Sequence, residues 1–177
     1  YKTGVFGKWH LGDAEKFMPT NHGFDEFYGI LFSNDMWPYH PEFPNAFPDD
    51  LLLYKNMEPI EILVDQSDLT KNITDESIRF IEENKDNQFF LYIAHPQPHV
   101  PLFASKDFDG STGEGLFADV ITEIDFSVGR VLDALEKYNL TENTVVVFTS
   151  DNGPWLSYGD HAGSSGIYRE GKGTAWE

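Results

Sequence analysis

The sequence predicts an α/β fold with a mostly parallel sheet and helices on both of its faces. Residues 88–94, QFFLYIA, form a continuous apolar run with aromatic side chains, which is typical of a strand buried on both faces. Residues 114–138 carry apolar side chains at helical spacing, and residues 144–150, TVVVFTS, form a second apolar run. A strand, a helix and a strand in this order predict a βαβ unit, whose two strands run parallel.

The other elements follow from local patterns. Residues 3–7, TGVFG, predict the end of a short strand, and the following 45 or so residues predict a long ordered loop because they are rich in aromatic residues, Pro, Asn and Asp. Residues 51–65 predict two short strands around a turn. Residues 67–84 predict a helix, with Leu69, Ile73, Ser77 and Ile81 spaced four apart.

Composition narrows the class of protein. The 177 residues are 40% hydrophobic, which is enough for one domain with a core. The formal net charge of −18 disfavours nucleic acid and anionic membranes as partners, since both reward clustered Lys and Arg. Without cysteine, the chain has neither disulfides nor thiolate metal sites. Its apolar runs are far shorter than the ~20 residues of a membrane span, so we expect none.

Chemically capable residues follow three of the predicted strands. Lys8, Trp9 and His10 follow the first strand, His95 and His99 follow the strand at 88–94, and Asp151 and Asn152 follow the strand at 144–150. Ligands of parallel α/β sheets gather beyond the carboxyl ends of the strands. We therefore expect these residues to meet at one edge of the sheet.

Geometry adds two expectations about side-chain directions. Lys8 and His10 alternate along an extended chain, so we expect both on one side, with Trp9 packing on the other. The prolines between His95 and His99 exclude a helix, and an extended path would point both imidazoles to the same side.

Taken singly, each of these residues also has an ordinary structural explanation. Asp151 and Asn152 are common turn residues, although they are also hard oxygen ligands for Ca²⁺ or Mg²⁺. A lone histidine is more often structural than catalytic. A lysine is usually a solvated surface charge, and this explanation also applies to Lys172 in REGKG. Ser33, in ILFSND, is by itself a loop hydroxyl. Together, however, lysines, imidazoles and a metal-ligand pair suit an oxyanion substrate.

Five segments resemble the arylsulfatase A-like branch of the formylglycine-dependent sulfatases, within the alkaline phosphatase superfamily. They are YKTGVFGKWHLGD, HGFDEFYGILFSNDMWP, FFLYIAHPQPHVPLFAS, FTSDNGPWLSYGDHAGSSG and REGKGTAWE, and they occur in the family's order over nearly the whole chain. The GKWHLG element is specific, whereas DNG alone is not. The resemblance implies an alkaline phosphatase/sulfatase-like fold.

The resemblance also implies a role for individual residues. Lys8 matches the lysine that contacts sulfate and the catalytic aldehyde hydrate, and His10 matches the histidine that deprotonates that hydrate as sulfate is expelled. His99 and Lys172 match the pair that binds the ester and protonates the leaving alcohol. Ser33 matches a serine of the substrate pocket. Asp151 and Asn152 match two ligands of the Ca²⁺ ion, with Mg²⁺ as the alternative. His95 has no firm counterpart.

By the same resemblance, residues 1–177 are the incomplete middle portion of a single sulfatase catalytic α/β domain. The formylglycine arises within a Cys/Ser-x-Pro-x-Arg motif, which this chain does not contain. We therefore expect the nucleophile segment before Tyr1 and a C-terminal subdomain after Glu177. We expect the 177 residues alone to be inactive.

The sequence thus predicts a sulfuric ester hydrolase that acts on aryl or carbohydrate sulfates, sulfated glycans included. The resemblance implies a periplasmic, extracellular or lysosomal location. Two alternatives stay open. One is a phosphatase or phosphonate hydrolase of the same superfamily. The other is a non-catalytic, sulfated-glycan-binding pseudoenzyme, because aromatic residues are frequent in the loop at 24–48.

Overall fold

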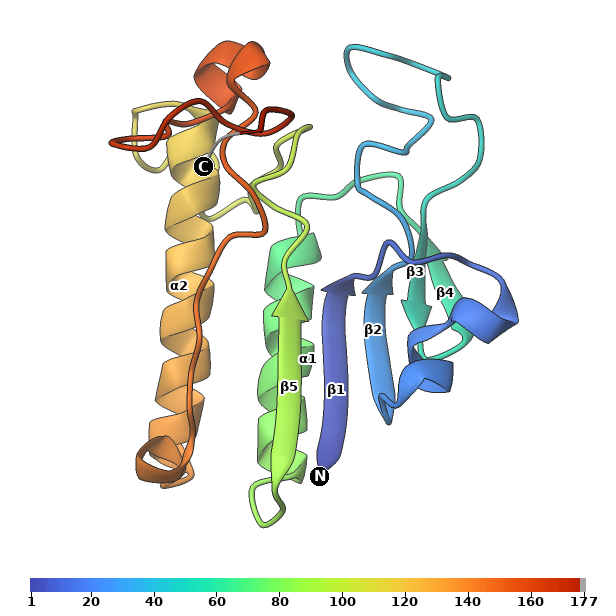
Figure 1. Cartoon of the computed structure of the whole chain (residues 1–177), viewed down its shortest axis with the longest axis vertical. Coiled ribbons are helices and arrows are strands. Elements are labelled where there is room, and N and C mark those ends of the chain that lie inside the picture. The colour runs from blue at the N-terminus through green and yellow to red at the C-terminus, as the bar shows by residue number, and fades with distance from the viewer. Residues whose placement is uncertain (176–177) are drawn as a thin grey trace.

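The computed structural model describes residues 1–175, which form a five-stranded sheet in the order β4-β3-β2-β1-β5 (Figure 1). β1 (Lys2–Lys8) pairs in parallel with β2 (Glu26–Ile30) and with β5 (Phe89–Ala94). β3 (Leu52–Lys55) and β4 (Glu58–Ile62) continue the sheet as an antiparallel hairpin. The α/β class and the hairpin are confirmed, and the parallel part of the sheet is confined to β2, β1 and β5.

The two α-helices pack side by side, and α1 covers one face of the sheet. α1 (Leu69–Glu83) buries Ile73 and Phe80 against Phe6 of β1. α2 (Leu116–Lys137) packs along α1, where Leu135 meets Ile81. Apolar side chains at helical spacing predicted both helices, and burial of these stripes stabilises them.

The opposite face carries only short 3₁₀-helices in the described part of the chain. η1 (Glu15–Phe17) and η2 (Pro19–His22) flank Met18, which is buried against Val5 and Phe27. The two faces of the sheet are therefore covered very differently.

Two further 3₁₀-helices, η3 (Thr141–Asn143) and η4 (Leu156–His161), follow α2.

Glycine at position 7 allows β1 to approach its neighbour closely. Gly7 has φ of +125°, and a Cβ atom at this position would lie 1.9 Å from the carbonyl oxygen of Ala94 in β5. A side chain here would force the two strands apart. This close pairing holds Lys8, the next residue, at the end of β5.

The structure corrects three expectations about strands. β2 lies within the segment that we expected to be a loop. The sequence did not predict this strand because its five residues are flanked by turn-like sequence. Residues 144–150 form no strand within residues 1–175, and Figure 1 draws them as a trace without a ladder partner. The expected βαβ unit is therefore not closed among the described residues.

The third correction concerns β5, which is not buried on both faces. Its side chains alternate, and Phe90 and Tyr92 are 54% and 51% exposed. Val145 and Val147, in the segment without a ladder partner, are 90% and 79% exposed. The apolar composition that predicted burial is thus present, but the described residues offer nothing to cover it.

No helix among residues 1–175 is long and apolar enough to cross a membrane.

Candidate active site

The carboxyl ends of β1 and β5 bring two predicted clusters to one edge of the sheet. Gly7 pairs with Ala94, so Lys8 and the residues after β5 leave the sheet at the same level. The register of these parallel strands is therefore what joins the motif GKWH to the motif HPQPH.

Lys8 is half-buried among other charges. Burial lowers the pKa of Lys8 below its ordinary value, and Lys172 lowers it further, whereas the carboxylates of Asp151 and Asp35 act in the opposite direction. Two lysines within electrostatic range of each other repel. A bound anion would relieve that repulsion.

His10 occupies an unusual backbone conformation. Its φ is +58°, in the left-handed region, and its N–H donates to the carbonyl oxygen of Leu31 at 2.9 Å. The pKa of His10 is lowered by partial burial and by the charge of Lys8. The indole N–H of Trp9 donates to the carbonyl oxygen of Phe17 at 2.8 Å, which anchors the turn.

His99 and Lys172, 73 positions apart, form a direct pair. Nζ of Lys172 lies 2.9 Å from Nε2 of His99, and Nδ1 of His99 lies 2.7 Å from the carbonyl oxygen of Val100. The carbonyl can only accept, so Nδ1 carries the proton and Nε2 accepts a hydrogen bond from the ammonium. Burial lowers the pKa of His99, with Lys172 adding to the effect, while Asp35 raises it.

His95 and His99 do not face the same side, contrary to expectation. The segment between them turns, and the N–H of His99 donates to the carbonyl oxygen of Pro96 at 3.2 Å. His95 instead reaches α2, where Nε2 lies 3.1 Å from the Ser127 hydroxyl, and its Nδ1 is buried without a partner. Burial lowers the pKa of His95 to about 4, so the ring is neutral at physiological pH.

Asp151 and Asn152 are both exposed, and the charge of Asp151 acts on Lys8. The segment that follows them packs against residues 171–172, and the N–H of Lys172 donates to the carbonyl oxygen of Pro154 at 3.0 Å. Among residues 1–175, no group of three or more His, Cys, Asp or Glu side chains could hold a metal ion. Asp151 and Asn152 stay predicted ligands.

Ser33 and Asp35 come from the loop after β2. Ser33 is 3% exposed, and its hydroxyl has no hydrogen-bond partner. Asp35, which the motif analysis missed, has a buried, unpartnered carboxylate oxygen, and its charge raises the pKa values of Lys8, His10 and His99. Its only sequence signal is its place two residues after Ser33.

Buried amides hold these loops together, and sequence analysis missed them too. The Asn34 side chain, fully buried, donates to the carbonyl oxygens of His99 and Pro101 at 3.2 and 3.1 Å. The Gln66 side chain donates to the carbonyl oxygen of Asn34 at 3.0 Å. Such contacts, 32 to 67 positions apart, have no local sequence signature.

Trp155 covers the His99–Lys172 pair and was also missed. Its ring lies 5.9 Å from the ring of His99, and Nζ of Lys172 lies 4.7 Å from the centre of the indole. A cation over an indole is held by the ring's electron density. Trp155 therefore fixes the position of Lys172 as well as covering it.

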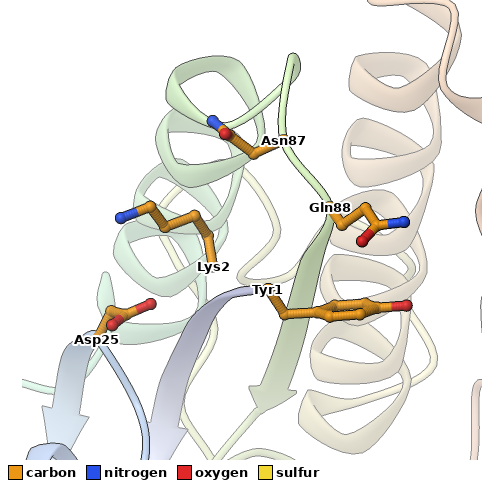
Figure 2. A pocket seen from close by; sticks show the side chains of 5 residues that line it. All are labelled: Tyr1, Lys2, Asp25, Asn87 and Gln88. Carbon is orange, nitrogen blue, oxygen red and sulfur yellow. The ribbon is translucent and has the colours of Figure 1, made fainter.

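A separate pocket of about 270 Å³ lies at the opposite end of β1 and β5 (Figure 2). It is lined by Tyr1, Lys2, Asp25, Asn87 and Gln88. None of the predicted site residues contributes to it, so the candidate active site is the cluster around Lys8 and Lys172.

Comparison with known proteins identifies the family. The sequence matches the Sulfatase family over residues 1–177. The chain belongs to the sulfatase family. It is 37% identical to an arylsulfatase of Hemicentrotus pulcherrimus over 189 residues, which cover all of this chain and 34% of that sulfatase. It is 35% identical to the N-acetylgalactosamine-6-sulfatase of Homo sapiens over 188 residues, covering 100% of this chain and 35% of the human protein.

The fold agrees with that of solved sulfatases. The PsFucS1 sulfatase from Pseudoalteromonas sp. superposes with a TM-score of 0.86 at 28% identity, over 100% of this chain and 40% of that protein. This sulfatase chain therefore spans about a third of the length of the curated relatives described above.

Proposed function

We propose that residues 1–177 are the middle portion of a single sulfatase catalytic domain, in a polypeptide of the relatives' length that we call the full-length protein. We further propose that the full-length protein is a sulfuric ester hydrolase. The observation that carries this proposal is the gathering of Lys8, His10, His99 and Lys172 at one edge of the sheet, in a chain of net charge −18.

The two lysines suit the binding of the sulfate group. Lys8 and Lys172 would each face the anionic oxygens, whose charge compensates the repulsion between the two ammonium groups. Because the rest of the protein is strongly acidic, this local positive charge would decide where an anion binds. Ser33 offers a further hydroxyl at the base of the loop after β2.

The His99–Lys172 pair suits protonation of the leaving alcohol. The ammonium of Lys172 donates one of its protons in a hydrogen bond to Nε2 of His99. As the bond between sulfur and the ester oxygen breaks, that oxygen would take this proton and leave as the alcohol. Trp155 would keep water away from the pair.

The proposed roles of His10, Asp151 and Asn152 depend on a nucleophile and a metal ion. A formylglycine would supply the nucleophilic oxygen from outside these 177 residues, which contain no Cys/Ser-x-Pro-x-Arg motif. His10 would accept a proton on its ring beside that oxygen. The oxygen donors of Asp151 and Asn152 fit Ca²⁺, or Mg²⁺, and would be two of its ligands, where the ion would offset negative charge.

The substrate class is tested with matched esters. We expect the full-length protein to release sulfate from sulfate monoesters faster than phosphate from the matching phosphate esters. The reverse preference would favour a phosphatase or phosphonate hydrolase. Binding of sulfated glycans without bond cleavage would identify a pseudoenzyme.

The role of the pair is tested with leaving groups. His99→Ala should reduce kcat/KM strongly for an alkyl sulfate, whose leaving alcohol needs a proton, and much less for 4-nitrophenyl sulfate, whose leaving group does not. Lys106→Ala, at an exposed lysine away from the cluster, is the matched control. Equal losses with both esters would remove His99 from proton transfer.

By family membership we also propose a periplasmic, extracellular or lysosomal location. Fractionation of the source cells, followed by an assay of each fraction for sulfate ester hydrolysis, tests this. Activity confined to the cytosol would contradict it.

A further inference from the structure

A second pocket lies between the loop after β2 and the segment around η4. Its volume is about 550 Å³, which is within the usual range for small-molecule sites. Its lining residues are Glu42, Phe43, Trp155, Ser157, Tyr158 and Gly159. Both contributing segments lie at the end of the sheet where β1 and β5 finish (Figure 1). The pocket is therefore on the same side of the molecule as the candidate active site.

Trp155 connects this pocket to the His99–Lys172 pair. The same indole lines the pocket, lies 5.9 Å from the ring of His99 and carries Nζ of Lys172 at 4.7 Å from its centre. The pocket therefore adjoins the pair that would give a proton to the leaving alcohol.

The lining is aromatic with a few polar groups. Trp155 and Tyr158 pack edge to face with ring centres 4.7 Å apart, and the phenyl ring of Phe43 is 54% exposed across from them. Exposed aromatic rings of this kind stack against flat apolar faces. Ser157 adds a hydroxyl and Glu42 a carboxylate, and both can bond to hydroxyl groups.

Glu42 gives the pocket a negative charge. Glu42 and Tyr158 both line the pocket, and the pKa of the Tyr158 phenol is raised by burial and further by the charges of Glu42 and Asp35. A second anionic group on the substrate would meet this charge, while neutral hydroxyl groups would donate to it. The charges at the two ends of the site are thus opposite: cations for the sulfate and an anion for the group attached to it.

We propose that this pocket binds the alcohol portion of the ester as an uncharged sugar ring and discriminates against rings that bear a carboxylate or a further sulfate. The proposal rests on the proposed function for the position of the ester. It goes beyond it by naming the chemical class of the alcohol and the residues that select it. The aromatic rings take the apolar face of the sugar, and Glu42 and Ser157 take its hydroxyl groups.

The experiment compares two sugar sulfates in the full-length protein. The substrates are a neutral hexose 6-sulfate and a sulfated hexuronic acid, and the variant is Glu42→Gln, which keeps the hydrogen-bonding shape and removes the charge. We expect kcat/KM for the neutral substrate to fall a few-fold, because a charged acceptor is lost. We expect the ratio of the uronate to the neutral substrate to rise about tenfold, as removal of a nearby like charge predicts.

Two further variants keep the test specific. Phe43→Ala, at an exposed ring, should raise KM for the neutral sugar sulfate several-fold and change kcat little, because it removes stacking and no proton donor. Glu142→Gln, in η3 away from the pocket, is the control for a lost negative charge and should leave the ratio unchanged.

The outcomes separate this proposal from the proposed function. If sulfate esters are hydrolysed but Glu42→Gln leaves the ratio of uronate to neutral substrate unchanged and Phe43→Ala leaves KM unchanged, the proposed role of the pocket is wrong. The proposed hydrolase function would then still hold. If no sulfate ester is cleaved, the proposed function fails, and calorimetric titration with the unsulfated hexose decides the pocket. Binding that Phe43→Ala weakens at least several-fold would support the pocket, and absence of binding would overturn it.

Discussion

Asp35 places a carboxylate beside groups that the proposed reaction uses as cations. Its charge raises the pKa values of Lys8, His10 and His99, so it favours their protonated forms. Because one of its oxygens has no hydrogen-bond partner, this electrostatic effect is its main visible action on the site. Asp35 thus acts through other residues and is a positioning residue.

Asp35→Asn should therefore lower the pKa of His99. If the His99–Lys172 pair must hold a proton to give to the leaving alcohol, activity falls as pH rises and the pair loses that proton. The alkaline limb of the kcat/KM profile of the full-length protein should shift to lower pH, and activity on the alkaline side should fall several-fold. Asp160→Asn, at an exposed position, is the control. An alkaline limb at its original pH would contradict this role.

His95 makes stability depend on pH. Its pKa is about 4 in the folded protein, against about 6.5 for an unfolded chain, because burial disfavours the charged ring. Above pH 6.5 both states are neutral, whereas between these two values only the unfolded state binds the proton. Stability should fall as pH falls through this window, by about 2 kcal/mol at pH 5.

His95→Gln should remove most of this dependence. The amide retains a hydrogen bond to the Ser127 hydroxyl but does not titrate. Denaturant unfolding of the full-length protein at pH 7 and pH 5 measures the difference, with His22→Gln, at an exposed histidine, as the control. If the free energy of unfolding changes between pH 7 and pH 5 by the same amount in the wild type and in His95→Gln, His95 is not the source of the pH dependence.

At the scale of elements, the loop after β2 is tied to the loop after β5 by one buried amide. Asn34→Ala would leave the carbonyl oxygen of His99 without its side-chain donor and that of Pro101 with only the Gln97 amide, at 3.3 Å. We expect a loss of about 1–3 kcal/mol in the free energy of unfolding. We also expect a fall in kcat/KM, since His99 would lose its support. Asn34→Asp should cost more, because a carboxylate would face two carbonyl oxygens.

Denaturant unfolding and steady-state kinetics of the full-length protein measure both effects. Asn21→Ala removes a side-chain bond at an exposed asparagine and serves as the control. Wild-type stability in Asn34→Ala would show that the two loops hold their positions independently of each other.

The elements that the sequence predicted are those with strong local periodicity. The stripe of apolar residues around Ile73 predicted α1, and the segment TGVFG predicted the strand that ends at Lys8. β2 was missed because five residues between turns carry little periodicity. Trp155, Asn34 and Asp35 join the site through distant contacts, which only the folded chain reveals.

At the scale of the whole molecule, two apolar surfaces are left without cover among residues 1–175. One is the outer face of β5, with Phe90 and Tyr92, and the other is the extended segment with Val145 and Val147. Both have the composition of buried strands. The chain spans 34% of one curated relative and 40% of a solved one, so a polypeptide of that length has ample residues to cover them. The apolar composition of these segments predicted burial, and their side chains are exposed among residues 1–175.

We therefore expect residues 145–148 to form a ladder in the full-length protein. Their backbone amides should exchange with solvent at least about tenfold more slowly there than in the isolated 177-residue chain, because ladder hydrogen bonds protect amides.

The isolated chain should also show no sulfate release, since it lacks a nucleophile motif and offers two oxygen donors where Ca²⁺ takes about 6–8. Hydrogen exchange and a sulfate-release assay on both proteins test the two expectations together. Equal exchange would mean that the segment stays unpaired, and turnover by the isolated chain would mean that its own side chains suffice for the chemistry.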